Sequence, residues 1–325
     1  MRAVVLDDKG GPEVLTVREV PVPEPGPEEV LVKVRSTALN RADLLQRMGF
    51  YPGPPMEHEI PGMEFSGTVV GVGSRVAERS VGDEVMGIVG GAAYAEQLAV
   101  HERQVMNVPS SVDLADAAAI PEVWITAFDA LVAQGGLTSG LTALVHAGAS
   151  GVGTAAIQIA NAIGARIAVT ASTGKVEACR SLGAHLAIDY TAQDFAEEVL
   201  AFTDGVGADV ILDVIGGDYL ARNLACVKTK GTIIQVGVMG DGSPAIDLGR
   251  LLRGRIRLIG TVLRARPLDE KIAITQQFAR EILPLFDRGS MHPVIDSRYD
   301  LDAIADAHRY MESNANVGKI LIDVG

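Results

Sequence analysis

The chain contains little cysteine and no long apolar run. Cys179 and Cys226 are the only thiols among 325 residues, too few for a disulfide framework, so a reducing compartment fits better. No stretch approaches the roughly 18 apolar residues of a membrane span. Residues 1–8 also reach acidic side chains before a signal-length apolar run can develop. We therefore expect a cytoplasmic protein with no membrane partner.

Basic residues are fewer than acidic ones, with 28 lysines and arginines against 41 aspartates and glutamates. The formal net charge is −13 at pH 7, which argues against nucleic acid or an anionic membrane as the main partner but allows a local basic pocket for phosphate. The hydrophobic fraction of 48% and the charged fraction of 21% are ordinary for a globular protein. A chain of this length is expected to form about two domains.

Metal-ligand spacing is also absent. None of the six histidines lies at a zinc-ligand spacing from another histidine or from a cysteine. We therefore expect no metal site and assign a structural role to each histidine: His58, His101, His146, His185, His292 and His308.

The first 120 residues predict a β-rich region. Short β-prone runs, bounded by glycine, proline or charge, occupy residues 3–6, 29–35, 65–72 and 94–100. A short helix is predicted at 41–47, after Asn40. The last region, 263–325, contains helical segments at 268–286 and 302–313. It ends in an apolar strand at 319–323, which could return to the first region's sheet.

Residues 121–262 change to an alternating pattern. Strands are predicted at 142–145, 166–170, 187–189, 210–214, 232–236 and 256–261, and helices at 151–162, 175–182 and 194–202. Strands alternating with helices of about 10 residues indicate crossover connections and a parallel sheet. The chain thus divides into residues 1–120, 121–262 and 263–325, with an α/β domain in the middle.

The sequence VHAGASGVG at residues 145–153 follows a predicted strand and opens a predicted helix. A glycine-rich turn in that position binds the pyrophosphate of a dinucleotide through backbone N–H groups at the helix start. We assign the tight turn to Gly148, the pyrophosphate contacts to Ser150 and Gly151, and close helix packing to Gly153. Ser150 stands where the strict G-x-G-x-x-G pattern has its second glycine. An ordinary strand–helix turn is the alternative.

No carboxylate follows the second strand of this region, where an NAD site usually carries one for the ribose. The chain instead reads TASTGK at residues 170–175. Its hydroxyl groups and single cation suit a 2′-phosphate, so the cofactor is predicted to be NADPH. The alternative is that Ser172 and Thr173 cap the next helix and that Lys175 is solvated.

Several strings together resemble the zinc-free quinone oxidoreductase family of the medium-chain dehydrogenase/reductase superfamily, and most of all its tumour-suppressor-inducible branch. The resemblance extends over essentially the whole chain. The strings are GGPEVL at 10–15, ALNRADL at 38–44, GFY at 49–51, IPGMEFSG at 60–67, VGDEV at 81–85, AAIPEVWITA at 118–127, the glycine turn, and GKI at 318–320.

Departures from the zinc-dependent relatives bear on the chemistry. Those enzymes have a zinc-ligand cysteine where this chain has Asn40 and a ligand histidine where it has Met63, and their four-cysteine structural zinc lobe has no counterpart here. A carboxamide and a thioether would not hold a catalytic zinc ion. The resemblance therefore implies an enzyme that works without a metal.

The resemblance also implies a fold and a set of site residues. A GroES-like catalytic domain, formed by the first and last regions, would be interrupted by a Rossmann domain, with the active site in the cleft between them. Tyr51 would face the substrate carbonyl, its alternative being packing over the turn at 52–55, and Lys319 could equally be an exposed strand residue. Asn40 would be a further catalytic donor. The implied cofactor contacts are Asn40, Thr126, Gly148, Ser150, Gly151, Val152, Ser172, Lys175, Tyr190, Gly216, Val238, Met239 and Lys319.

These expectations lead to an NADPH:quinone oxidoreductase. NADPH would pass hydride to a quinone, and hydrogen-bond donors would meet the negative charge on the substrate oxygen. An NADPH-dependent reductase of enone or enal double bonds remains an alternative, as does a cofactor-binding protein with little catalysis. Family members pair through the edge of the Rossmann sheet, so we expect a homodimer joined near residues 256–261.

Overall fold

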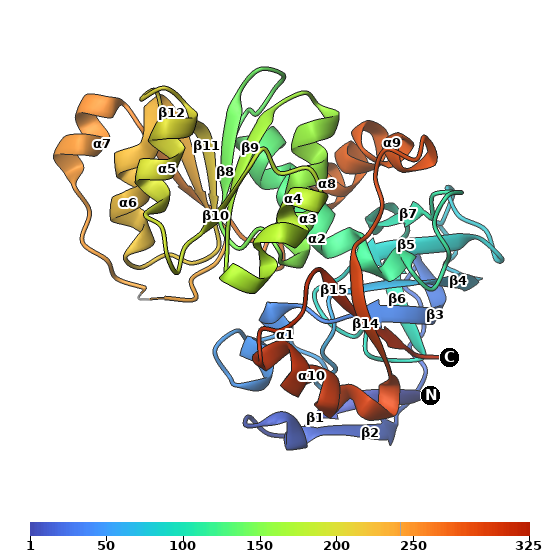
Figure 1. Ribbon diagram of the computed structural model, residues 1–325. Helices are drawn as coiled ribbons and strands as arrows, with labels where there is room; N and C mark the ends of the chain where they lie inside the picture. The colour runs from blue at the N-terminus through green and yellow to red at the C-terminus, as the bar shows by residue number, and fades with distance from the viewer. Residues whose placement is uncertain (241) are drawn as a thin grey trace. The chain divides into compact units, whose positions relative to one another are not determined.

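The structure is a computed structural model that describes residues 1–240 and 242–325. The chain forms two compact units, Met1–Ile125 with Arg264–Gly325, and Thr126–Leu263. The colour gradient of Figure 1 shows both ends of the chain in the first unit. Within the described part, no helix is both long and apolar enough to cross a membrane.

The first unit is built on antiparallel strands. β15 (Lys319–Asp323) pairs antiparallel with β3 (Glu29–Ala38), so the C-terminal segment returns to the sheet of the first region. A separate hairpin joins β1 (Arg2–Leu6) to β2 (Leu15–Glu19). The seven-stranded sheet has the order β14 (Ile295–Asp300), β15, β3, β4 (Glu64–Val72), β5 (Glu84–Ile88) and β7 (Val105–Asn107), with β6 (Gln97–His101) paired to β3.

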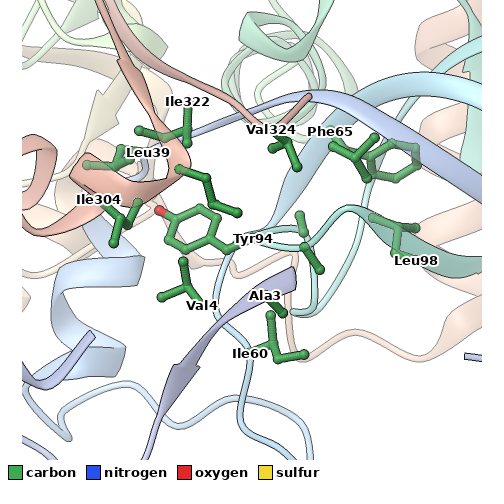
Figure 2. Packing of buried hydrophobic residues seen from close by; sticks show 14 of the residues in the cluster. Ala3, Val4, Leu39, Ile60, Phe65, Tyr94, Leu98, Ile304, Ile322 and Val324 are labelled. Carbon is green, nitrogen blue, oxygen red and sulfur yellow. The ribbon is translucent and has the colours of Figure 1, made fainter. Parts of the chain in front are cut away.

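The core of the first unit surrounds Tyr94, whose side chain is fully buried. Figure 2 shows Val4, Leu39 and Ile304 around its ring. A buried phenol needs a hydrogen-bond partner, and the Tyr94 hydroxyl donates to Asp43 Oδ2 at 3.0 Å. The hydrophobic core is thereby joined to a carboxylate in the first turn of the helix Arg41–Arg47.

Four helices of the first unit are α1 (Arg41–Arg47), α8 (Leu268–Glu281), α9 (Leu283–Asp287) and α10 (Ile304–Glu312). The sequence predicted one helix over 268–286, and this prediction was wrong because the segment breaks at Ile282. Pro284 causes the break, since its ring clashes with the preceding turn and it has no N–H to continue the helical bonding. It is tolerated in the first turn of α9.

The second unit is a six-stranded parallel sheet, which confirms the predicted Rossmann architecture. Its order is β10 (Leu186–Asp189), β9 (Arg166–Ala171), β8 (Thr142–Val145), β11 (Ala208–Asp213), β12 (Val227–Gln235) and β13 (Arg257–Gly260). The strand order reverses between β8 and β11. Open parallel sheets bind ligands beyond the carboxyl ends of the strands at such a switch point.

Helices cover both faces of this sheet. Figure 1 shows α3 on one side of the strands and α5 and α6 on the other. The helices are α3 (Gly151–Ala162), α4 (Val176–Ser181), α5 (Phe195–Phe202), α6 (Tyr219–Cys226) and α7 (Leu248–Gly254). A further helix, α2 (Pro121–Phe128), crosses from the first unit's residues into the second's. Strand interiors such as Leu144, Val169 and Ile211 are fully buried, as two covered faces require.

The packing of β4 against β3 gives a test of the first unit's fold. A Cβ at Gly67 would lie 2.2 Å from the backbone oxygen of Lys33, whereas a Cβ at Gly71 would make an ordinary contact at 3.4 Å with Leu31. Gly67→Ala should therefore lower the free energy of unfolding by about 1–3 kcal/mol. Gly71→Ala, the same change on the same strand, should stay within about 0.5 kcal/mol. Equal urea midpoints for the two variants would contradict this packing.

Candidate active site

The glycine-rich turn joins the end of β8 to the start of α3. The residue with left-handed backbone is Ala147, with φ 56°, and not Gly148. Gly148 follows it in the turn that is closed by the hydrogen bond from Ser150 N to the Ala147 oxygen, at 2.9 Å. Gly148 is required because a Cβ there would lie 2.5 Å from Val169 Cβ, and Gly153 because a Cβ would lie 2.4 Å from the Ala147 oxygen. These glycines let β9 and the first turn of α3 approach the turn closely.

The first turn of α3 presents hydrogen-bond donors. Ser150 is its N-cap, with Oγ accepting from Gly153 N at 3.1 Å, and the Ser150 oxygen accepts from Thr154 N. The N–H groups of Gly151 and Val152 have no carbonyl partner within the helix, as at every helix N-terminus. A strand followed by such a turn fits the pyrophosphate of a dinucleotide.

The carboxyl ends of β9 and β10 bring together the residues predicted to hold a 2′-phosphate. Ala171 pairs with Asp189 across the two strands, and Tyr190 N donates to the Ala171 oxygen at 3.2 Å. The next residue, Ser172, is the N-cap of the short helical turn Thr173–Lys175, but its hydroxyl makes no capping hydrogen bond. Its backbone oxygen accepts from Lys175 N at 2.8 Å.

Asp189 is a carboxylate at the same end of the sheet. Its Oδ1 accepts from Thr191 N at 3.0 Å and from Thr191 Oγ1 at 2.6 Å. The hydroxyl groups of Thr173 and Thr191 lower the pKa of Asp189. The carboxylate is therefore already hydrogen-bonded to threonine side chains of the loops that follow β9 and β10.

Gly216, Val238 and Met239 meet beyond the ends of β11 and β12. Gly216 has φ 68°, and a Cβ there would contact Val238 Cγ1 at 3.4 Å. Met239 N donates to the Ile215 oxygen at 2.9 Å. Val238 and Met239 expose 51% and 54% of their surface, which is unusual for neighbouring apolar side chains and suits an aromatic ligand.

A buried polar network lies in the first unit. Lys319 Nζ donates to Asn40 Oδ1 at 2.7 Å, to the Leu39 oxygen at 2.7 Å and to Glu64 Oε1 at 2.8 Å. These acceptors use all three N–H groups of the ammonium. Lys319 is only 3% exposed, so the alternative of an exposed strand residue is wrong.

The other members of this network are equally engaged. Asn40 Nδ2 donates to Glu64 Oε1 at 2.8 Å and, at 3.5 Å, to the Ala38 oxygen. The second carboxylate oxygen of Glu64 accepts from Glu122 N, in the first turn of α2, at 2.8 Å. The sequence did not reveal this role of Glu64, because its partners come from three separate segments.

Asp43 extends the network toward the core. Its Oδ2 accepts from the Asn40 backbone N–H at 2.8 Å and from the Tyr94 hydroxyl. Complete burial raises the pKa of Asp43 to about 6. Asn40 is thus fixed through its backbone by Asp43 and through its side chain by Lys319 and Glu64.

Tyr51 lies against Arg264, a residue that the sequence did not single out. The Arg264 guanidinium carbon is 5.1 Å from the centre of the Tyr51 ring. Arg264 donates to the backbone oxygens of Gly90 and Tyr51, at 2.6 and 3.4 Å, and to Gln46 Oε1 at 2.6 Å. Among the described residues, the Tyr51 hydroxyl has no hydrogen-bond partner, and partial burial raises its pKa. The phenol is therefore protonated at neutral pH and free to donate.

The remaining predicted contact, Thr126, is buried in α2 as the first residue of the second unit. Met63 is buried at the residue before Glu64. No group of three His, Cys, Asp or Glu side chains able to hold a metal ion lies within the described ranges.

Two protein-family models match the chain. The one described as alcohol dehydrogenase GroES-like domain matches residues 26–110, and the one described as zinc-binding dehydrogenase matches residues 151–280. The first match falls in the β-rich unit, and the second begins at the first residue of α3.

Individual relatives align over nearly the full length. The synaptic vesicle membrane protein VAT-1 homologue of Rattus norvegicus is 31% identical over 344 residues, covering 100% of this chain and 84% of the relative. A quinone oxidoreductase of Pseudomonas aeruginosa is 34% identical over 319 residues, covering 96% of each. The solved structure of Escherichia coli quinone oxidoreductase complexed with NADPH has a TM-score of 0.90 at 26% identity, covering 100% of both chains.

The buried network gives a stability prediction. Lys319→Met leaves the Glu64 carboxylate buried without its cation, which should lower the free energy of unfolding by about 3–5 kcal/mol. Lys33→Met, the same change at an exposed position of β3, should cost no more than about 0.5 kcal/mol. Chemical denaturation of both variants measures the difference. Indistinguishable midpoints would show that Lys319 and Glu64 do not form the buried pair.

Proposed function

This chain belongs to the quinone oxidoreductase-like family of the medium-chain dehydrogenase/reductase superfamily, and we propose that it reduces quinones with NADPH and without a metal ion. The observation that carries the proposal is the network of Lys319, Asn40 and Glu64. Asn40 stands where the zinc-dependent relatives have a ligand, and both polar atoms of its amide are used within this network. The Lys319 ammonium thus already binds Asn40, the side chain that would lie next to a metal ion in the zinc-dependent relatives.

The second unit supplies the residues for the nicotinamide cofactor. Ser150, Gly151 and Val152 would bind the pyrophosphate through the first turn of α3. The hydroxyl groups of Ser172 and Tyr190 and the ammonium of Lys175 would bind the 2′-phosphate of NADPH. A bound NADPH supplies a hydride from its nicotinamide. The Escherichia coli structure, which contains NADPH, supports this choice of cofactor.

In the second unit, Gly148 would shape the pyrophosphate turn, and Thr126, Gly216, Val238 and Met239 would contact the nicotinamide end. Lys319 would act indirectly, by fixing Asn40, because its three N–H groups already have acceptors. Asn40 retains one weakly engaged N–H, 3.5 Å from the Ala38 oxygen, as a further donor.

Reduction of a quinone leaves negative charge on the substrate oxygen, and a donor must meet it. Tyr51 has the required properties, because its pKa is raised by burial and its hydroxyl is unused among the described residues. A quinone suits a site with few hydrogen-bond donors, since the anion formed by its reduction is delocalised over an aromatic ring. Reduction of an enone, the second candidate activity, would produce a less stabilised enolate and depend more on Tyr51.

The two free cysteines, Cys179 and Cys226, are both buried, and burial raises their pKa to about 11 and about 12. Thiols of this kind are inert and unpaired, which supports a reducing, cytoplasmic location.

Tyr51→Phe tests the catalytic assignment. Loss of one donor should cost about 1–3 kcal/mol of transition-state stabilisation, so quinone turnover should fall severalfold to about a hundredfold while NADPH affinity is nearly unchanged. Tyr299→Phe, in the same unit, is the matched control and should retain wild-type turnover. The quantities to measure are kcat with a quinone panel and with an enone panel, and the NADPH dissociation constant. Weaker NADPH binding with unchanged kcat would make Tyr51 a packing residue.

Cofactor preference tests the 2′-phosphate site. One cation and two hydroxyl groups should favour NADPH over NADH by about tenfold to a thousandfold in affinity. Lys175→Met should narrow that ratio, whereas Lys230→Met, at an exposed position of the same unit, should not. Calorimetric titration of both dinucleotides gives the ratio. Equal dissociation constants in the wild type would refute the preference.

We also propose a homodimer formed through β13. This strand is an edge of the parallel sheet, and Leu248, Leu252, Leu258 and Val262 near it are all exposed, Leu252 by 75%. A second copy would satisfy the edge and cover these side chains. Light scattering should report twice the chain mass of 34.1 kDa, and Leu252→Glu should shift the protein toward monomer. Val206→Glu, at another exposed site of this unit, is the control; a wild-type monomer at micromolar concentration rules the dimer out.

A further inference from the structure

A chain of buried polar groups crosses the carboxyl ends of β9, β8 and β11 in the second unit. His146 Nδ1 is 3.1 Å from Thr170 Oγ1, and His146 Nε2 is 2.8 Å from Asn223 Oδ1. Asn223 Nδ2 donates to Asp213 Oδ2 at 2.9 Å. All four side chains are at most 1% exposed.

The partners fix the direction of this chain. Asn223 donates to the Asp213 carboxylate with its Nδ2, so its Oδ1 faces the imidazole and can only accept. His146 Nε2 must therefore carry the proton, and Nδ1 accepts from the Thr170 hydroxyl. The neutral Nε2–H tautomer satisfies every member.

The two side chains at the ends of this hydrogen-bonded series, Thr170 and Asp213, each bond to the backbone of a turn. Thr170 Oγ1 accepts from Ala147 N at 3.4 Å, in the glycine-rich turn. Asp213 Oδ1 accepts from Ile215 N at 2.6 Å and from Gly216 N at 3.0 Å. Ala147 and Gly216 both have positive φ, 56° and 68°. A positive φ strains the backbone at Ala147, whereas Gly216 is free to adopt many conformations. Both turns therefore need fixed hydrogen-bond partners to keep one geometry.

We propose that Thr170, His146, Asn223 and Asp213 form a positioning relay that sets the glycine-rich turn and the turn at residues 215–217 in one geometry for the dinucleotide. This inference rests on the proposed function, since the two turns matter together only if one ligand contacts both. None of the four side chains touches substrate in this role. They act through the backbone N–H groups that they hold.

The surroundings of His146 favour its neutral form. Phe195 of α5 and Tyr219 of α6 pack against the imidazole with ring centres 4.7 Å away in each case. Burial lowers the pKa of His146, with the charge of Arg222 adding to this and that of Asp213 opposing it. Protonation would turn Nδ1 into a donor and reverse the bond to Thr170.

The tautomer is tested by 15N NMR on the full chain labelled at histidine, with His146 assigned from the resonances lost in His146→Gln. The expected spectrum shows a protonated Nε2 and an unprotonated Nδ1 that stay unchanged from about pH 6 to 8, the interval in which exposed histidines titrate. A protonated Nδ1, or titration of His146 in that interval, overturns the relay.

The positioning role is tested by NADPH affinity. Thr170→Val keeps the shape of the side chain but removes the hydroxyl, and should weaken NADPH binding about tenfold at pH 7. Thr170→Ser should restore it. Thr142→Val, the same change at the buried amino end of β8, is the control and should bind like the wild type. Melting temperatures measured in parallel separate affinity from stability.

The outcomes distinguish the relay from the proposed function. If wild type binds NADPH and Thr170→Val binds it equally well, at whatever cost in melting temperature, the positioning role is overturned and the cofactor site stands. If wild type binds neither NADPH nor NADH, the proposed function itself is overturned, and the relay's role falls with it.

Discussion

The rest of the first unit depends on one buried ion pair, between Lys319 and Glu64. Two charges in a protein interior are costly unless each is hydrogen-bonded as fully as it would be in water. Here the ammonium has three acceptors, and the carboxylate accepts from Lys319, from Asn40 and from the N-terminal turn of α2. The positive end of that helix adds to the stabilisation of the carboxylate. The constraint joins β15, the β3–α1 junction, β4 and α2 at one point.

In the proposed reaction, this constraint would also let the first unit act without a metal ion. The amide of Asn40 is held on both sides, and Asp43 holds its backbone. The polar groups at this point are thus nearly satisfied before any ligand arrives, whereas the Tyr51 hydroxyl has no hydrogen-bond partner among the described residues. Arg264 donates a hydrogen bond to the backbone oxygen of Tyr51, and its guanidinium lies beside the Tyr51 ring. Preorganised donors of this kind stabilise developing charge without reorganising during the reaction.

Local patterns predicted much of the fold and little of its long-range chemistry. The alternating apolar strands and helices of the middle region were sufficient for a parallel sheet, and the helix at 41–47 was predicted with its observed bounds. The break at Pro284 could have been read from proline alone. Strands β2, β5, β7 and β14 and helices α2, α6 and α7 were missed, because they are short and their burial comes from partners distant in sequence. The roles of Lys319 and Arg264 were equally hidden, since Lys319 contacts Asn40 across 279 residues and Arg264 contacts Gln46 across 218.

The central claim is that Asn40 and Met63 stand at the positions of the metal ligands, that the Lys319 ammonium holds Asn40 in place, and that the proposed reaction runs on hydrogen-bond donors alone. Its most direct test is to dialyse the purified protein against a strong chelator and to measure zinc content and NADPH-dependent quinone reduction in the same sample. The account predicts less than about one zinc ion per ten chains, together with undiminished turnover, because a carboxamide and a thioether at the ligand positions do not hold zinc. Stoichiometric zinc before dialysis, with activity lost on its removal and regained on its return, would contradict it.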